Sequence, residues 1–321
     1  MIFEKKVMSI YKSVAFSRCD DTKTARYFSA SDFEGLAEDA YPFRSKKGNK
    51  LSGRFYYYEG YNPERLIVFD HGMGGGHRSY MREIEMLCKH GYRVFAYDHT
   101  GCMESEGENT GGMGQSLSDL DDAINALRSD EKYSSLDISV IGHSWGGYAA
   151  INIIALHHEI SHVVVLSGFL SVERLVKSFM RGILSLYRKP VLKLEREAHS
   201  ETVHHDAIET LKDTEIPVLL IYSDTDPLCP RKAHYDPLYA ALSHKPNIRF
   251  MLEHNKGHNP NYTEDAVKYL GEYLKRKSEM QKAGKLTTDE EKRAFVSSFD
   301  WKKMTEQDAG VWEEIFKTLD K

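Results

Sequence analysis

Short apolar runs alternate with helical patterns along most of this chain. Between residues 40 and 276, seven runs have the length and apolar content of β-strands, at residues 51–58, 65–70, 93–97, 138–142, 162–166, 218–223 and 248–253. Several are rich in Val and Ile without alternating with polar residues, which is typical of strands buried on both faces of a parallel sheet. Helical spacing recurs between two of these strands, at Leu117, Leu120, Ile124 and Leu127. The alternation predicts an α/β fold with a doubly wound, mostly parallel sheet.

One long segment interrupts this alternation. Residues 170–212 are too long for a single crossover and contain no strand-like run. We therefore expect a small helical cap inserted into a core that is formed by residues 40–169 and 213–276. Within the cap, apolar residues at helical spacing predict one amphipathic helix, at Leu175, Phe179, Ile183 and Tyr187.

The two ends of the chain extend this core. Residues 1–39 form an N-terminal extension with few readable patterns. Residues 277–321 are highly charged but contain several aromatic side chains, at Phe295, Phe299, Trp301, Trp312 and Phe316. This combination predicts a helical C-terminal extension docked on the body or on a second subunit, and the second case would make a homodimer.

Composition narrows the class of protein. A hydrophobic content of 41% and a charged content of 28% are ordinary for a soluble globular chain. The net charge of −5 argues against a nucleic-acid binder, which normally carries a basic surplus. The four cysteines form no C-x-x-C pair, which suggests reduced thiols. Because no signal peptide and no run of membrane-spanning length is evident, we expect a cytoplasmic protein without stable membrane insertion.

The stretch Gly142–Gly146 carries the strongest chemical signal. It spells G-x-S-x-G, with Ser144 at its centre, and it stands between a strand-like run and a helix-like run. A strand, a sharp turn with a serine and then a helix form the context of a nucleophile elbow. The glycines have a steric reason to be there, because side chains at 142 and 146 would collide with the neighbouring strand and helix.

A serine nucleophile requires a histidine to take its proton and a carboxylate to orient the histidine. In an α/β fold with such an elbow, the acid and then the histidine follow on loops at the ends of later strands. The strand at 218–223 leads into a loop with Asp224 and Asp226. The strand at 248–253 leads into a loop with His254 and His258. Each loop thus offers two candidates.

Over residues 40–276 these motifs resemble the α/β-hydrolase superfamily, and in particular its small-cap carboxylesterases, monoacylglycerol lipases and cinnamoyl esterases. The resemblance implies that the acid lies in a G-x-x-D-x-x-x-P pattern, which Ser223, Asp226 and Pro230 match with Ser in place of Gly. It also favours His258, which follows a glycine. His254 is then expected to pack in its loop or to contact substrate.

The resemblance further implies an oxyanion hole built from two backbone N–H groups. One would belong to Trp145, directly after the nucleophile, and the other to Met73, which follows the His71-Gly72 pair after a strand. The stretch 97–107 is similar to the family's D-x-R-G-x-G-x-S-x-G loop, although Thr100 and Met103 depart from it. We expect this loop to be structural, with Asp98 accepting hydrogen bonds from backbone N–H groups.

A competing motif lies at residues 158–162, which spell H-E-x-x-H, the zinc-protease signature. That chemistry requires both histidines on one face of a continuous helix. Here the segment is expected to end a helix, since Val163 begins a buried strand directly afterwards. The glycines at 72–76 fit neither G-x-G-x-x-G nor the P-loop pattern. We therefore expect no metal and no organic cofactor.

These inferences converge on a lipase-like serine esterase that hydrolyses small-molecule carboxylic esters. Leu175, Phe179 and Ile183 of the cap are expected to cover the acyl pocket. The cap also holds seven Lys or Arg residues against three Glu between positions 171 and 197, which raises the hypothesis of an anionic substrate attracted by Arg174, Lys177 or Arg181. The alternatives are a prolyl-aminopeptidase-like serine peptidase, a thioesterase, an acyltransferase or a non-catalytic ligand-binding protein of the same fold.

Overall fold

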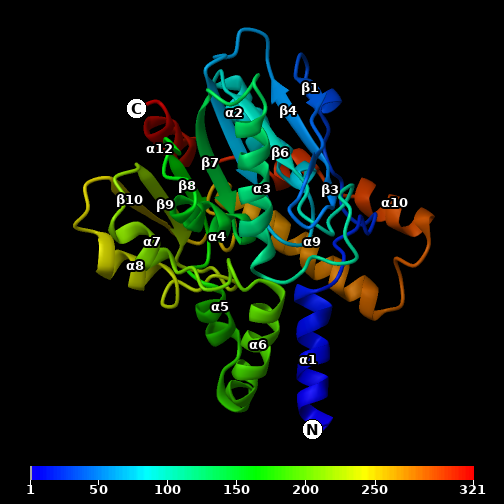
Figure 1. Cartoon of the computed structure of the whole chain (residues 1–321). Helices are drawn as coiled ribbons and strands as arrows, with labels where there is room; N and C mark the ends of the chain where they lie inside the picture. The colour runs from blue at the N-terminus through cyan, green and yellow to red at the C-terminus, as the bar shows by residue number, and fades with distance from the viewer. Residues whose placement is uncertain (1) are drawn as a thin grey trace.

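A single eight-stranded sheet forms the centre of the computed structural model, which describes residues 2–321 (Figure 1). Its strand order is β1-β4-β6-β5-β7-β8-β9-β10. The strands from β6 to β10 run parallel, and β1 and β4 add an antiparallel edge. Their bounds are β1 Ala37–Ala40, β4 Gly53–Tyr57, β5 Arg65–Asp70, β6 Arg93–Tyr97, β7 Asp137–His143, β8 Val163–Leu166, β9 Val218–Ser223 and β10 Ile248–Glu253. The doubly wound, mostly parallel sheet predicted from the sequence is confirmed.

Helices cover both faces of this sheet, and two hydrophobic clusters result. Leu66 and Val68 of β5 point into the first cluster, whereas Ile67 and Phe69 point into the second. This is why the strand shows no polar alternation: both of its faces are buried. The first cluster includes α3 (Gln115–Ser129), α4 (Trp145–Asn152), α7 (Ala207–Lys212) and α8 (Tyr235–Leu242), and the second includes α2 (Met81–Lys89), α9 (Glu264–Lys282) and α12 (Ala309–Leu319).

The cap departs from the expected single helix. It consists of α5 (Val172–Phe179), the 3-10 helix η4 (Gly182–Tyr187) and α6 (Arg188–Ala198). The chain leaves the α-helical conformation after Phe179 and reaches Gly182 with a φ of +57°, a left-handed conformation that glycine adopts without strain. The predicted continuous helix is therefore wrong.

This break separates the three residues expected to cover the acyl pocket. Leu175 is buried in the first cluster, whereas the side chains of Phe179 and Ile183 are 52% and 69% exposed. The single helical face expected to carry all three residues does not exist, and their role in covering the acyl pocket stays a prediction. The last helix of the predicted cap segment, α7, contacts α4 and α8 of the core.

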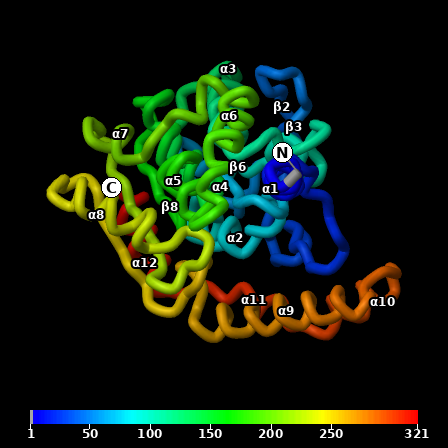
Figure 2. The backbone as a smooth tube through the Cα atoms, turned by 90° about the horizontal axis from the view of Figure 1, so that it is seen from below, coloured from blue at the N-terminus to red at the C-terminus, as the bar shows by residue number. Residues whose placement is uncertain are grey.

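The N-terminal helix α1 (Ile2–Ala15) lies beside the cap, as both views show (Figures 1 and 2). The Tyr11 hydroxyl donates to the buried carboxylate of Glu195 on α6 over 2.5 Å. The rings of Phe3 and Tyr187 lie 5.4 Å apart between their centroids. Further along, η1 (Ala30–Asp32) precedes β1, and the short pair β2 (Phe43–Arg44) and β3 (Lys50–Leu51) forms a separate two-stranded sheet.

The C-terminal extension docks on the body of its own chain. It comprises α10 (Asp289–Ser297), α11 (Trp301–Met304) and α12. Phe295, Trp301 and Trp312 are buried in the second hydrophobic cluster. Arg249 of β10 pairs with Glu314 of α12. Among the two placements expected, the structure shows docking on the body, and the homodimer through this extension stays a prediction. No helix within residues 2–321 combines the length and apolarity needed to cross a membrane.

Candidate active site

Ser144 occupies a sharp turn between the end of β7 and the start of α4. Its φ of 56° and ψ of −109° are strained for a residue with a side chain. The glycines on either side make this turn feasible. A Cβ on Gly142 would overlap the backbone carbonyl of Gly146, and a Cβ on Gly146 would overlap the carbonyl oxygen of Asp70. The turn therefore projects the Ser144 hydroxyl from the carboxyl edge of the sheet.

The structure brings Ser144, His258 and Asp226 together in one hydrogen-bonded row. His258 Nδ1 lies 2.8 Å from an Asp226 carboxylate oxygen, and its Nε2 lies 2.8 Å from the Ser144 hydroxyl oxygen. An ionised carboxylate only accepts, so Nδ1 carries the proton and Nε2 is free to accept from the hydroxyl. This is the hydrogen-bonding pattern of a Ser-His-Asp triad.

The two runner-up residues form a second pair of their own. His254 Nδ1 lies 2.7 Å from the Asp224 carboxylate, and the His254 side chain is 75% exposed. This pair lies at the surface and makes no hydrogen bond with Ser144. The ring of His254 is thus held by Asp224, and its contact with substrate stays a prediction.

Asp226 is held in its ionised form by its surroundings. Its side chain is fully buried, and its second oxygen accepts from the N–H groups of Leu228 and Cys229 at 2.8 and 2.9 Å. Burial alone would raise the pKa of this carboxyl, but the His258 hydrogen bond, its charge and the two N–H groups bring the pKa below its usual value. The carboxylate is thus suited to stabilise a positive charge on His258.

Two residues of this row and a neighbouring cysteine are of the types that bind metal ions. Asp226, Cys229 and His258 place potential ligand atoms within 4.8 Å of one another. Burial raises the pKa of the Cys229 thiol well above its usual range, which disfavours the thiolate that a metal would require. Because His258 and Asp226 already hydrogen-bond to each other, the three residues do not fit an ion.

Of the two residues expected to form an oxyanion hole, one directly follows Ser144 and the other lies in a loop that contacts the elbow. Trp145 is the first residue of α4, so its N–H has no acceptor within the helix. Met73 follows Gly72 in the loop after β5. A Cβ on Gly72 would come within 3.3 Å of the His143 carbonyl oxygen, so this loop runs directly against the elbow.

His143, which the sequence reasoning did not single out, links three parts of this site. Its Nε2 lies 2.8 Å from the carbonyl oxygen of His258. Its Nδ1 lies 2.8 Å from the hydroxyl oxygen of Tyr80, and that oxygen accepts from the N–H of Gly72. Burial, together with the charge of His258, lowers the pKa of His143 to about 3, so the ring stays neutral.

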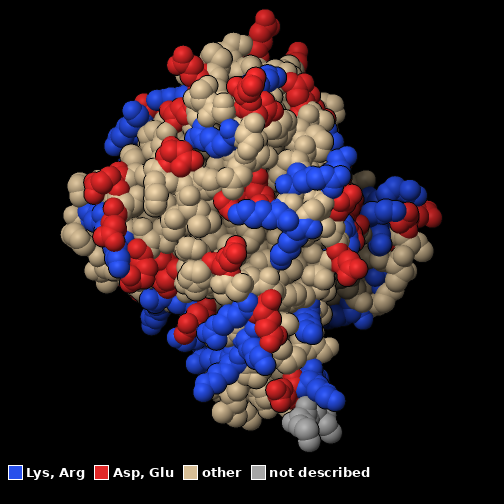
Figure 3. Space-filling model, in the orientation of Figure 1, with Lys and Arg blue, Asp and Glu red and all other residues tan. Residues whose placement is uncertain are grey.

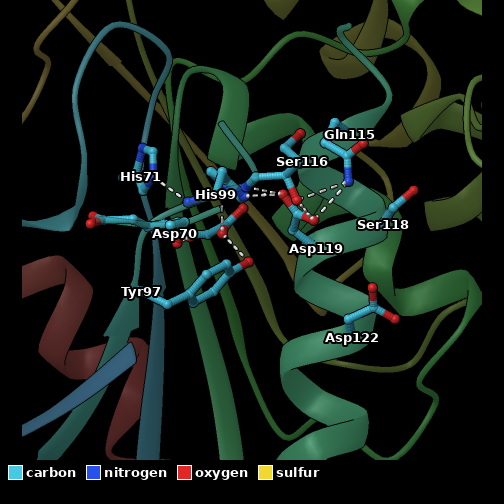
Figure 4. Close-up of polar contacts among 12 residues, drawn as sticks. Asp70, His71, Tyr97, His99, Gln115, Ser116, Ser118, Asp119 and Asp122 are labelled. Atoms are coloured by element: carbon cyan, nitrogen blue, oxygen red, sulfur yellow. Dashed lines mark hydrogen bonds and ion pairs between the residues drawn. The ribbon is translucent and has the colours of Figure 1, made fainter. Parts of the chain in front are cut away.

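A second unpredicted feature is a fully buried group of charges under the elbow (Figure 4). His99 lies between Asp70 at the end of β5 and Asp119 on α3, with N–O distances of 3.1 and 3.3 Å. Burial would lower the pKa of His99, but the two carboxylates outweigh it and raise the pKa to about 10. The His99 ring centroid lies 4.7 Å from that of Trp145. We call Asp70, His99 and Asp119 the buried ion cluster.

Other polar groups complete this cluster. Tyr97 donates a hydrogen bond to Asp70 over 2.6 Å. Asp119 accepts hydrogen bonds from the Gln115 amide and from both the backbone N–H and the hydroxyl of Thr100. The N–H of His99 donates to the ring of His71 in the loop before Met73. The cluster therefore connects the Met73 loop, the elbow and α3.

Two further expectations can be compared with the structure. Asp98 accepts from the backbone N–H groups of His77 and Glu104, as predicted, and also pairs with the His77 ring.

Residues 158–162 are not helical: after the 3-10 helix η3 (Ile153–Ala155) the chain turns and enters β8. His158 and His162 therefore do not share the helix face that a zinc protease requires.

The sheet order and the serine at the turn between β7 and α4 are those of an α/β-hydrolase fold. Residues 61–209 match the family model described as "Serine aminopeptidase, S33", a segment that includes Ser144 and ends before Asp226. A 116-residue stretch is 32% identical to rat (Rattus norvegicus) monoglyceride lipase and covers 36% of each chain. The match thus spans about a third of that relative.

Solved structures extend this similarity over most of the chain. An esterase from Pyrococcus furiosus has 23% identity and a TM-score of 0.58, covering 78% of this chain and 94% of its own. An acetyl xylan esterase from Paenibacillus sp. R4 has 17% identity and a TM-score of 0.56, covering 80% and 88%. The chain therefore has the α/β-hydrolase fold, and over about a third of its length its sequence is similar to a monoglyceride lipase.

Proposed function

We propose that this protein is a serine hydrolase that cleaves carboxylic esters through an acyl-enzyme on Ser144. The observation that carries the proposal is the row in which His258 joins the strained Ser144 hydroxyl to a buried carboxylate. The similarity to a monoglyceride lipase and to esterases supports an ester as the substrate.

In the proposed reaction, the Ser144 oxygen attacks the ester carbonyl carbon while its proton moves to His258 Nε2. Asp226 stabilises the imidazolium that forms. The N–H groups of Met73 and Trp145 donate to the oxyanion of the tetrahedral intermediate. The intermediate collapses, and the leaving alkoxide takes the proton from His258. A water molecule, deprotonated by His258, then releases the carboxylic acid and restores the serine.

A serine aminopeptidase is the second candidate, because the matching family model carries that description. An aminopeptidase must bind the charged α-amino group of its substrate, which favours an exposed carboxylate near the nucleophile. In this chain two carboxylates beside the elbow, Asp70 and Asp226, are buried and already paired. This arrangement favours the ester over the peptide.

Covalent labelling tests the proposal directly. The wild-type protein and a Ser144→Ala variant would be treated with a fluorophosphonate and then assayed on nitrophenyl esters of increasing chain length and on aminoacyl nitroanilides. We expect labelling of the wild type alone and ester turnover that falls by at least about 10³-fold in the variant.

The outcomes separate the candidates. No labelling of the wild type, or equal turnover by both proteins, would refute a serine hydrolase. Labelling of Ser144 with turnover of nitroanilides but not of esters would assign the site to the peptidase. Ser129→Ala, which removes an exposed hydroxyl at the end of α3, is the matched control and should leave labelling intact.

A further inference from the structure

The cap and α1 expose apolar side chains at one end of the molecule. Among the residues whose burial is described, 3–321, ten large hydrophobic side chains are strongly exposed, and six of them lie on these elements: Phe3, Ile10, Val14, Phe179, Ile183 and Leu186. The largest exposures are those of Ile183 at 69% and Leu186 at 73%, both on η4. We call Phe3, Phe179, Ile183 and Leu186 the apolar tip. An apolar patch of this kind marks an interaction surface rather than random exposure.

Basic side chains surround this tip. Residues 2–15 and 171–197 together carry ten Lys or Arg against four Glu, on a chain whose net charge is −5. In Figure 3 the Lys and Arg side chains gather over α5 and α6, next to the tan surface at the lower end of the cap. Glu195 is buried, and Glu173 and Glu197 are each paired with a lysine of the same helix. Arg181, Lys189 and Arg196 are exposed and, within the described residues, form no ion pair.

The tip is one structural unit although its residues are far apart in the sequence. The Tyr11 hydroxyl joins α1 to Glu195 of α6, and the Phe3 ring packs against Tyr187 at the end of η4. Val7 and Met8 of α1 pack against the first hydrophobic cluster. These contacts hold α1 along the cap, with the N-terminal end of α1 beside the end of the cap farthest from the sheet (Figure 1).

We propose that the apolar tip and the basic residues around it form a docking surface for anionic lipid bilayers. The exposed side chains of Ile183 and Leu186 would enter the interface between headgroups and acyl chains. Arg181 and Lys189, which flank η4, would lie at the level of the anionic headgroups. Amphipathic surfaces of peripheral proteins bind bilayers through the same combination of apolar insertion and basic contact.

The positive charge around the apolar tip favours a bilayer over a second copy of the chain as the binding partner. A symmetric dimer through the tip would bring two surfaces with a surplus of positive charge together, which is unfavourable. An anionic bilayer is complementary to both the apolar and the charged part of the surface. The proposal does not depend on the proposed ester hydrolysis, because binding requires neither Ser144 nor turnover.

Vesicle flotation with the full-length protein tests this surface. The wild type would be mixed with vesicles of phosphatidylcholine, either alone or with phosphatidylglycerol. We expect binding to the anionic vesicles that weakens as salt is added. Neutralising Arg181 and Lys189 together to Gln should lower the partition coefficient by about 25-fold, since each charge contributes about fivefold. Replacing Ile183 and Leu186 with Ser should lower it by roughly tenfold or more.

Matched variants control for loss of charge or apolar surface in general. Leu274→Ser removes an exposed leucine from α9, away from the tip, and should leave binding unchanged. Ser144→Ala should bind as the wild type does, so a failure of the proposed hydrolysis would not affect this result. Equal binding to neutral and anionic vesicles, or full binding by the tip variants, would overturn the proposal. The proposal would also be overturned if the wild type bound no vesicles and light scattering showed a dimer that the tip substitutions dissociate.

Discussion

The ring of His143 donates a hydrogen bond from Nε2 to the backbone carbonyl oxygen of His258 over 2.8 Å. The carbonyl can only accept, so Nε2 carries the proton of the neutral ring, and Nδ1 accepts from the hydroxyl of Tyr80. The residue before the proposed nucleophile thus holds the loop of the proposed base. Because the elbow and this loop belong to different strands, their relative position depends on this contact.

We therefore predict that His143 is a positioning residue. His143→Ala removes the contact and should lower kcat by about 10- to 100-fold, as expected for a small displacement of His258. His143→Gln, whose amide N–H can donate to the same carbonyl, should restore part of the activity. Steady-state kinetics with a nitrophenyl ester measure both. The positioning role is refuted if His143→Ala changes only KM and not kcat, or if the His143→Gln variant is as inactive as the His143→Ala variant.

The two Asp–His pairs at the ends of β9 and β10 provide an internal control for the proposed triad. Asp226→Asn should lower kcat by about 10⁴-fold, because an amide no longer stabilises the imidazolium. Asp224→Asn alters the other Asp–His pair, at the surface, in which the Asp224 carboxylate lies 2.7 Å from His254 Nδ1. This substitution should leave kcat close to the wild-type value. The same contrast is expected between His258→Ala and His254→Ala. Comparable losses in both pairs would contradict the assignment of Asp226 and His258.

The buried ion cluster should make the stability of the fold depend on pH. The pKa of His99 is raised from 6.5 to about 10 in the folded protein. A raised pKa means that the folded state binds the proton more tightly than the unfolded chain does. The stabilisation is therefore fully present below about pH 6.5 and is lost as the pH rises towards 10.

His99→Gln tests this dependence. The substitution leaves two buried carboxylates without a cation, and it should lower the free energy of unfolding by about 3–5 kcal/mol near neutral pH. The difference between the wild type and the variant, measured by urea unfolding, should shrink as the pH approaches 10. His254→Gln, at an exposed pair, should cost less than about 1 kcal/mol at any pH. A difference for His99→Gln that grows with pH would contradict a charged His99.

Much of the fold could be predicted because the relevant signals are local. The strands at 65–70, 93–97, 218–223 and 248–253 were predicted with the bounds the structure gives. The first three are short Val- and Ile-rich or aromatic runs that are buried on both faces, and such runs can be recognised without knowing what packs against them. The elbow is equally local, since its strain and its glycines are required by a single turn.

The features that were missed depend on tertiary contacts. The break in the cap at Gly182 follows from the packing of α6 against α5 and α1, which no periodicity within the segment reveals. The ion cluster joins the ends of two strands to Asp119, which lies among the apolar positions of a helix. One signal was available: His71, His99 and His143 each follow or end a strand at the edge where the proposed nucleophile lies.

The strain at Ser144 leads to a last prediction, which concerns stability rather than turnover. A non-glycine residue at a φ of 56° and a ψ of −109° costs about 1–3 kcal/mol, and the cost is retained in Ser144→Ala because alanine also has a Cβ. Ser144→Gly removes it. We expect the glycine variant to be inactive yet more stable than the alanine variant by about 1 kcal/mol, a value reduced by the larger backbone entropy that glycine loses on folding. Thermal and urea unfolding of both variants measure the difference. Equal stability would mean that the turn is relaxed in solution, whereas a more stable glycine variant would mean that the fold maintains a strained serine at the position where the proposed reaction needs it.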